Sequence, residues 1–220
     1  MQLNSSEPNE RYNEGKPAKK QTDRQGDGPG KEIRPRIFAA VPIGEEAADA
    51  LAVWAKSAFG VETFRRWTDP RDYHFTLKFL GDVEQEDIPA VESALREAFL
   101  GETPFAMTLD GAGTFGLPEA PRVLFAEPEE GSAALERLAA AAESALAPLG
   151  FAPEKRSFRA HLTLARKYAA GQRPFEPALL KTAPVLSAGT VDRAVLYRTH
   201  MHQRPMYERI AEFPFGGSGT

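Results

Sequence analysis

The chain has 220 residues, a formal net charge of −4 and no cysteine, which excludes disulfides, thiolate metal sites and cysteine nucleophiles. No apolar run approaches the ~20 residues that span a bilayer, and the polar N-terminus lacks the apolar core of a signal peptide. We therefore expect a cytoplasmic protein without a membrane partner. The slightly acidic balance also argues against a general polyanion binder.

Residues 1–33 differ from the rest of the chain in composition. They contain six acidic residues, six basic residues and seven Gly or Pro, with almost no large apolar side chain. Such a segment buries too little surface to offset the entropy lost on ordering. We expect a disordered tail at 1–33 and a single domain over 34–220.

The first part of the domain predicts alternating strands and helices. Residues 36–42 form an apolar run closed by a proline, and the helix that follows has Glu45 and Glu46 in its first turn, where the helix dipole favours acids. A second helix is amphipathic, with apolar residues three and four apart. The expected order is strand 36–42, helix 44–58, irregular 59–72, strand 73–80, helix 84–100 and strand 105–110.

The second part repeats this order. We expect a strand at 122–126, a helix from its N-cap Ser132 to about residue 149 with Gly150 beyond it, and a strand at 158–166. Two further strands are predicted at 190–199 and 206–213. The repeated order indicates a weak internal duplication. The expected fold is α+β and bilobal: two pseudo-symmetric lobes whose antiparallel sheets flank a central cleft, with the helices outside.

A short pattern, His-x-Thr-Leu, occurs at 74–77 and again at 161–164 in a chain with four histidines. Both copies fall in predicted strands, where side chains alternate between two faces. His161 and Thr163 then share one face, opposite Leu162 and Leu164. In the first copy, the expected faces are His74, Thr76 and Lys78 on one side, and Phe75, Leu77 and Phe79 on the other.

Two histidines with adjacent hydroxyl groups suit metal-free chemistry at a phosphate. Opening a cyclic phosphodiester with water requires one group to accept a proton and another to donate one on the opposite side of phosphorus. Histidine, with an ordinary pKa of about 6.5, can do either near neutral pH. Threonine hydroxyls and a nearby arginine would bind the non-bridging oxygens. The pattern therefore requires no metal and no cofactor.

These motifs resemble those of the 2H phosphoesterase superfamily, specifically its RNA 2′,3′-cyclic phosphodiesterases, the LigT-like group formerly called 2′-5′ RNA ligases. The resemblance covers about residues 34–213 and is carried by 36–40, 66–67, 74–81 and 158–166, although Ala160 stands where a proline is common. It implies metal-independent hydrolysis of RNA 2′,3′-cyclic phosphate ends to 2′-phosphate ends. It also implies that His74 is the proton donor and His161 the proton acceptor, while Thr76, Thr163 and Arg166 hold the phosphate.

Other interpretations of the same residues stay open. The substrate could be another small cyclic nucleotide or an ADP-ribose cyclic phosphate, or the chain could be a non-catalytic module that binds RNA ends. Strand alternation places Arg166 on the same face as Leu162 and Leu164, so its side chain could simply cover the core. His200 and His202 could chelate a metal, but no third ligand is suggested. Without a coiled-coil pattern or long apolar stripe, we expect a monomer.

The aromatic residues form a further alternative. Four of them could stack on a nucleobase, although most are expected in the core: Phe38, Trp67, Tyr73 and Phe158.

Overall fold

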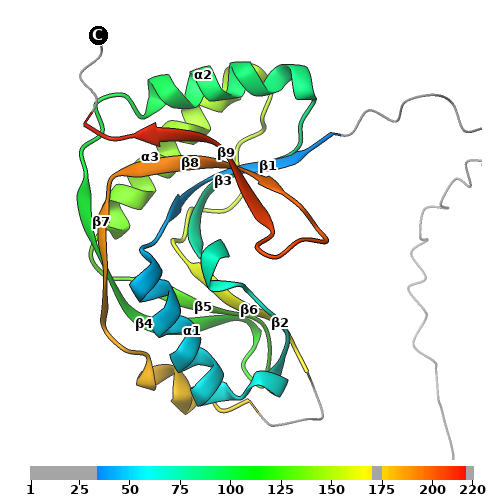
Figure 1. Ribbon diagram of the computed structural model, residues 1–220, viewed down its shortest axis with the longest axis vertical. Helices are drawn as coiled ribbons and strands as arrows, with labels where there is room; N and C mark the ends of the chain where they lie inside the picture. The colour runs from blue at the N-terminus through cyan, green and yellow to red at the C-terminus, as the bar shows by residue number, and fades with distance from the viewer. Residues whose placement is uncertain (1–33, 170–174, 217–220) are drawn as a thin grey trace, which may run out of the picture. The chain divides into compact units, whose positions relative to one another are not determined.

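A computed structural model describes residues 34–169 and 175–216, and the tail predicted at 1–33 lies outside the described residues. Within the described part, nine strands form one antiparallel sheet in the order β7-β4-β5-β6-β3-β1-β8-β9, with β2 paired to β6 (Figure 1). The strands are β1 (Arg36–Pro42), β2 (Phe64–Trp67), β3 (His74–Asp82), β4 (Phe105–Leu117), β5 (Ala120–Pro128), β6 (Leu162–Tyr168), β7 (Leu186–Val191), β8 (Arg193–Thr199) and β9 (Tyr207–Pro214). The α-helices are α1 (Glu45–Phe59), α2 (Ile88–Ala98) and α3 (Ser132–Leu146).

The three helices and one face of the sheet enclose the main hydrophobic core. Helix α1 contacts β6 and β7, while α3 contacts β3 and α2 contacts both α3 and β9. Strand β1 shows how the two faces differ, since Ile37 and Val41 belong to the main core, whereas Phe38 belongs to a small cluster on the other face. The second face of the sheet therefore carries its own aromatic cluster.

Most of the predicted elements are confirmed, although several bounds differ and three features depart from the prediction in kind. Ser132 does not cap α3, because Gly131 precedes it with a φ of 89° and no side chain caps the helix. The single strand predicted at 190–199 is wrong, since the chain leaves β7 at Val191 and enters β8 at Arg193. The stretch expected to be irregular contains β2, a short strand that the sequence pattern did not indicate.

The α+β class with antiparallel strands is confirmed, but the division into two lobes is not. Two sets of four strands are recognisable, β6-β5-β4-β7 and β3-β1-β8-β9, and they join at β3 and β6 in one continuous sheet. The two motif strands are therefore neighbours in one sheet, joined at the Phe75–Leu162 pair.

Among the described residues, no helix is both long enough and apolar enough to cross a membrane. The cytoplasmic location, the monomeric state and the domain limits 34–220 stay predictions.

Candidate active site

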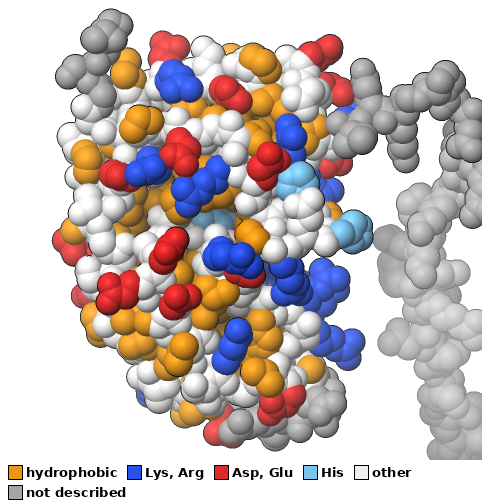
Figure 2. Space-filling view, in the orientation of Figure 1, with side chains coloured by type: hydrophobic (Ala, Val, Ile, Leu, Met, Phe, Trp, Pro, Cys, Tyr) orange, Lys and Arg blue, Asp and Glu red, His pale blue; other side chains and the backbone are white. Residues whose placement is uncertain are grey.

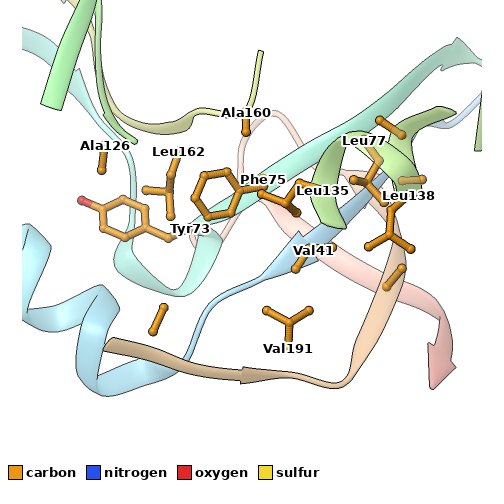
Figure 3. Packing of buried hydrophobic residues seen from close by; sticks show 14 of the residues in the cluster. Val41, Tyr73, Phe75, Leu77, Ala126, Leu135, Leu138, Ala160, Leu162 and Val191 are labelled. Carbon is orange, nitrogen blue, oxygen red and sulfur yellow. The ribbon is translucent and has the colours of Figure 1, made fainter. Parts of the chain in front are cut away.

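The two His-x-Thr motifs meet where the halves of the sheet join. Strands β3 and β6 are antiparallel, with Phe75 opposite Leu162, and both side chains are fully buried in the main core, where Figure 3 labels them. Extending this register places His74 beside Thr163, and Thr76 beside His161. On this register the two histidines are diagonal neighbours, with their Cα atoms roughly 7–8 Å apart. The arrangement has an approximate twofold axis through the Phe75–Leu162 pair.

A β-bulge changes the faces of β3 after the motif. Thr76 pairs with Ala40 but Lys78 pairs with Ala39, which leaves Leu77 as an extra residue. Leu77 and Lys78 are consequently both buried, while Phe79 is 58% exposed and contacts Phe38 of the second face. The prediction that Lys78 shares the face of His74 and that Phe79 lies on the apolar face is wrong, because a bulge reverses alternation beyond it.

A matching bulge lies at the same position in β6. Thr163 pairs with Phe125 and Ala165 pairs with Leu124, so that Leu164 is the extra residue. Arg166 therefore returns to the face of Thr163, where its Nη2 donates a hydrogen bond to the Thr163 Oγ1 over 3.3 Å. Arg166 therefore does not lie on the apolar face of β6, where simple strand alternation would have placed it. The strand itself begins at Leu162, later than predicted, so His161 lies at its N-terminal edge.

Both motif histidines are held by the same type of hydrogen bond. The Nδ1 of His74 lies 2.7 Å from the carbonyl oxygen of Asp72, and the Nδ1 of His161 lies 2.8 Å from that of Arg159. Because a carbonyl oxygen only accepts, each Nδ1 carries the proton, and the lone pair of the neutral ring is at Nε2. The Nε2 of His74 is 3.1 Å from the Thr76 Oγ1. Each histidine thus directs Nε2 away from its backbone anchor.

Aromatic rings surround both imidazoles. The centroid of His74 is 4.9 Å from that of Phe38 and 5.2 Å from that of Tyr207. The His161 ring meets Phe115 and Phe125 edge-on, at 5.0 and 5.7 Å. Of these neighbours only Phe38 was singled out from the sequence, since the others come from distant strands and carry no motif.

Burial and nearby positive charge favour neutral histidines in the free protein. Burial is the main cause that lowers the pKa of His74 to about 4. The hydrogen bond to Asp72 opposes it, while the charge of Arg166, and that of His161 when it is protonated, lower the pKa further. The pKa of His161 is also lowered, chiefly by burial and then by Arg166 and Arg159. Arg166 therefore acts electrostatically on both rings.

Asp72 links the first motif to β9. Its buried carboxylate accepts hydrogen bonds from the backbone N–H groups of Met206, at 2.8 Å, and Tyr207, at 3.2 Å. Burial raises the pKa of this carboxyl group, which the two N–H groups oppose. Since the carbonyl of Asp72 anchors His74, one residue positions both that imidazole and the Tyr207 ring beside it. No sequence signal marked Asp72 for this role.

A pocket of about 400 Å³ opens beside the motifs. Thr76 and His161 line it, together with Glu136 and Glu143 of α3 and most residues of the segment 153–159. His74, Thr163 and Arg166 are not among its lining residues. The pocket therefore adjoins one side of the motif pair.

The His200–His202 pair follows β8, where the backbone N–H of His200 donates to the Met206 carbonyl oxygen. The Nε2 of His200 is 2.8 Å from a carboxylate oxygen of Glu208. Within residues 34–169 and 175–216, no three His, Cys, Asp or Glu side chains come together as a metal-binding group.

The class of this protein is an α+β fold whose single antiparallel sheet brings two His-x-Thr strands together. Comparison with known families assigns the chain further. The family model described as the 2′-5′ RNA ligase superfamily matches residues 45–203. The chain belongs to this superfamily.

Two bacterial relatives are named RNA 2′,3′-cyclic phosphodiesterase. That of Geobacillus stearothermophilus is 39% identical over 186 residues, which cover 84% of this chain and 59% of that protein. That of Bacillus subtilis is 36% identical over 182 residues, covering 83% of this chain and 97% of that protein. The chain thus spans less than two thirds of the first relative and nearly all of the second.

Solved structures share the fold. A Thermus thermophilus protein superposes with a TM-score of 0.66 at 28% identity, covering 84% of this chain and all of that one. Escherichia coli LigT complexed with 3′-AMP superposes with a TM-score of 0.68 at 24% identity, covering 83% of this chain and 99% of that one.

Proposed function

We propose that the chain hydrolyses RNA 2′,3′-cyclic phosphate ends to 2′-phosphate ends without a metal ion. The observation that carries the proposal is the pairing of the two motifs about Phe75 and Leu162, with both histidines anchored through Nδ1. The shared name of the bacterial relatives supports the substrate class.

In the proposed reaction, the cyclic phosphate lies between the two imidazoles. The Nε2 of His161 takes a proton from water as the water oxygen attacks phosphorus, and the bond from phosphorus to O3′ breaks. The protonated Nε2 of His74 gives its proton to O3′, which leaves a 2′-phosphate. Thr76, Thr163 and Arg166 bind the non-bridging oxygens, where negative charge grows in the transition state.

Substrate binding favours the protonated form of His74 that the reaction needs, and the proton itself is taken up from solvent. In the free protein its pKa is lowered to about 4, so the ring is neutral at pH 7. A phosphodiester anion placed beside the imidazole favours the protonated form and raises this pKa. Binding of the substrate therefore favours the protonated form of His74 that acts as the general acid.

The proposal is tested with an oligonucleotide that ends in a 2′,3′-cyclic phosphate, incubated with the protein in excess EDTA. We expect full turnover and a 2′-phosphate product, with hydrolysis shown by the mass gain of one water and the 2′ position by chromatographic comparison with synthetic 2′-phosphate and 3′-phosphate oligonucleotides. Loss of turnover in EDTA would contradict the metal-free mechanism. Tight binding without turnover would favour a non-catalytic RNA-end module, and turnover only of ADP-ribose cyclic phosphate or another small cyclic nucleotide would favour those substrates.

The pH dependence of kcat/KM reports the free protein. Catalysis needs one histidine protonated and the other neutral, and the pKa of each is lowered from 6.5. We therefore expect the maximum of kcat/KM below pH 6.5, with a fall of about tenfold per pH unit above the higher of the two apparent pKa values. The profile of kcat should lie at higher pH, because the bound anion raises the pKa of His74. A kcat/KM maximum above pH 7 would contradict this account.

A further inference from the structure

A second arginine stands directly beside Arg166. In the pairing of β2 with β6, Arg66 lies opposite Arg166, and both side chains are exposed. Like charges at directly opposed positions weaken strand pairing, so this pair has no evident role in stabilising the fold. Figure 2 shows Lys and Arg side chains gathered on the side of the molecule where β2 lies in Figure 1.

The two arginines lack the acidic partners that several other exposed arginines have. Arg71 pairs with Asp69, Arg159 with Glu127, and Arg193 with Asp192 and Glu212. Across the described residues, no carboxylate pairs with Arg66 or Arg166, and the one hydrogen bond of their guanidinium groups is that of Arg166 to Thr163. Two adjacent guanidinium groups are thus left to bind an anion.

Their positions differ relative to the histidines. Arg166 influences the pKa of both His74 and His161, whereas Arg66 influences neither and lies on β2, which pairs with β6 alone. Arg166, hydrogen-bonded to Thr163, therefore lies at the motif pair, and Arg66 is one strand further out. Guanidinium groups bind phosphate oxygens through paired N–H donors.

We propose that Arg66 binds the backbone phosphate on the 5′ side of the terminal nucleotide, while Arg166 holds the cyclic phosphate. This inference rests on the proposed function and adds a substrate class: RNA strands of two or more nucleotides are preferred over mononucleoside 2′,3′-cyclic phosphates. A mononucleoside 2′,3′-cyclic phosphate has no second phosphate for Arg66 to bind.

The test compares Arg66→Gln with the unaltered protein on two substrates, a short oligonucleotide with a 2′,3′-cyclic phosphate end and a mononucleoside 2′,3′-cyclic phosphate. On the oligonucleotide we expect KM to rise about tenfold with kcat nearly unchanged. The reason is that the lost charge-assisted contact is made equally in the ground state and the transition state. The slope of log KM against log salt should fall by about one. On the mononucleoside substrate, neither constant should change.

Arg65→Gln is the matched control, since Arg65 is the adjacent, equally exposed arginine of β2 and only Arg66 is paired opposite Arg166. It should leave both substrates unaffected. Equal effects of Arg66→Gln on both substrates, no effect on either, or an equal effect of Arg65→Gln would overturn the inference.

A binding measurement separates this inference from the proposed catalysis. Fluorescence anisotropy with an oligonucleotide ending in a 2′-phosphate reports the Arg66 contact without turnover. If the unaltered protein hydrolyses neither substrate but Arg66→Gln weakens this binding about tenfold, the contact stands and the catalytic proposal fails. If binding is unchanged, the contact itself is refuted.

Discussion

His74→Ala and His161→Ala should each lower kcat on a 2′,3′-cyclic phosphate end by about 10²–10⁴-fold, the usual contribution of one positioned acid or base. Each histidine has its Nδ1 bonded to a backbone carbonyl oxygen, so alanine removes the imidazole that we propose transfers the proton. The double variant should be little worse than either single one, because the two groups act in one step. Rates are measured by following the 2′-phosphate product.

Their pH profiles distinguish the two roles. Without the proton acceptor, His161→Ala should lose the fall in kcat/KM on the acid side. Without the donor, His74→Ala should lose the fall on the alkaline side. The opposite pattern would reverse the assignment of acid and base.

His200→Ala is the control for these variants, since His200 pairs with Glu208 and lies outside the motif pair. It should retain nearly full turnover. Damage equal to that of the motif variants would mean that the site is misassigned.

Glu143→Ala should lower the free energy of unfolding by about 3 kcal/mol, because it leaves a buried ammonium group without its counter-ion. The bulge in β3 turns Lys78 into the core, where its side chain is 2% exposed and its Nζ lies 2.9 Å from a Glu143 carboxylate oxygen. The Nζ also donates to the Ala152 carbonyl oxygen over 2.6 Å. This loss of unfolding free energy is at the low end of the range for a broken buried ion pair, because the Glu143 side chain is 27% exposed and water reaches it.

Urea unfolding curves measure the effect. Glu136→Ala is the matched control on the same helix, since Glu136 is exposed, and we expect it to change stability by less than about 0.5 kcal/mol. Replacing both partners, Lys78→Met with Glu143→Leu, should recover most of the stability. Equal effects of Glu143→Ala and Glu136→Ala would show that the buried pair contributes nothing.

Local sequence determined the elements and the motif residues. The apolar run at 36–42 and the amphipathic pattern of the helices correspond to β1, α1 and α2, because hydrophobic periodicity reports which face of an element is buried. The repeated His-x-Thr pattern identified His74, Thr76, His161 and Thr163, since alternation places each pair on one face.

The register of the strands and the positions of the bulges could not be predicted from local sequence. The two bulges depend on which residues of β1 and β5 face β3 and β6, a non-local choice that local alternation does not record. They turned Lys78 inward and Arg166 outward, against the predicted faces. The same holds for the aromatic rings around the histidines and for Asp72, whose partners are more than a hundred residues away.

The sequence by itself therefore determined the chemistry that the chain carries: two histidines, each with a hydroxyl two residues on, in two strands. Tertiary structure decided how those strands meet. It made them neighbours in one antiparallel sheet and brought Arg166 to the same face. It also set Arg66 beside Arg166. Backbone hydrogen bonds between distant strands fix these positions, and such pairings depend on the whole sheet rather than on any short stretch of sequence.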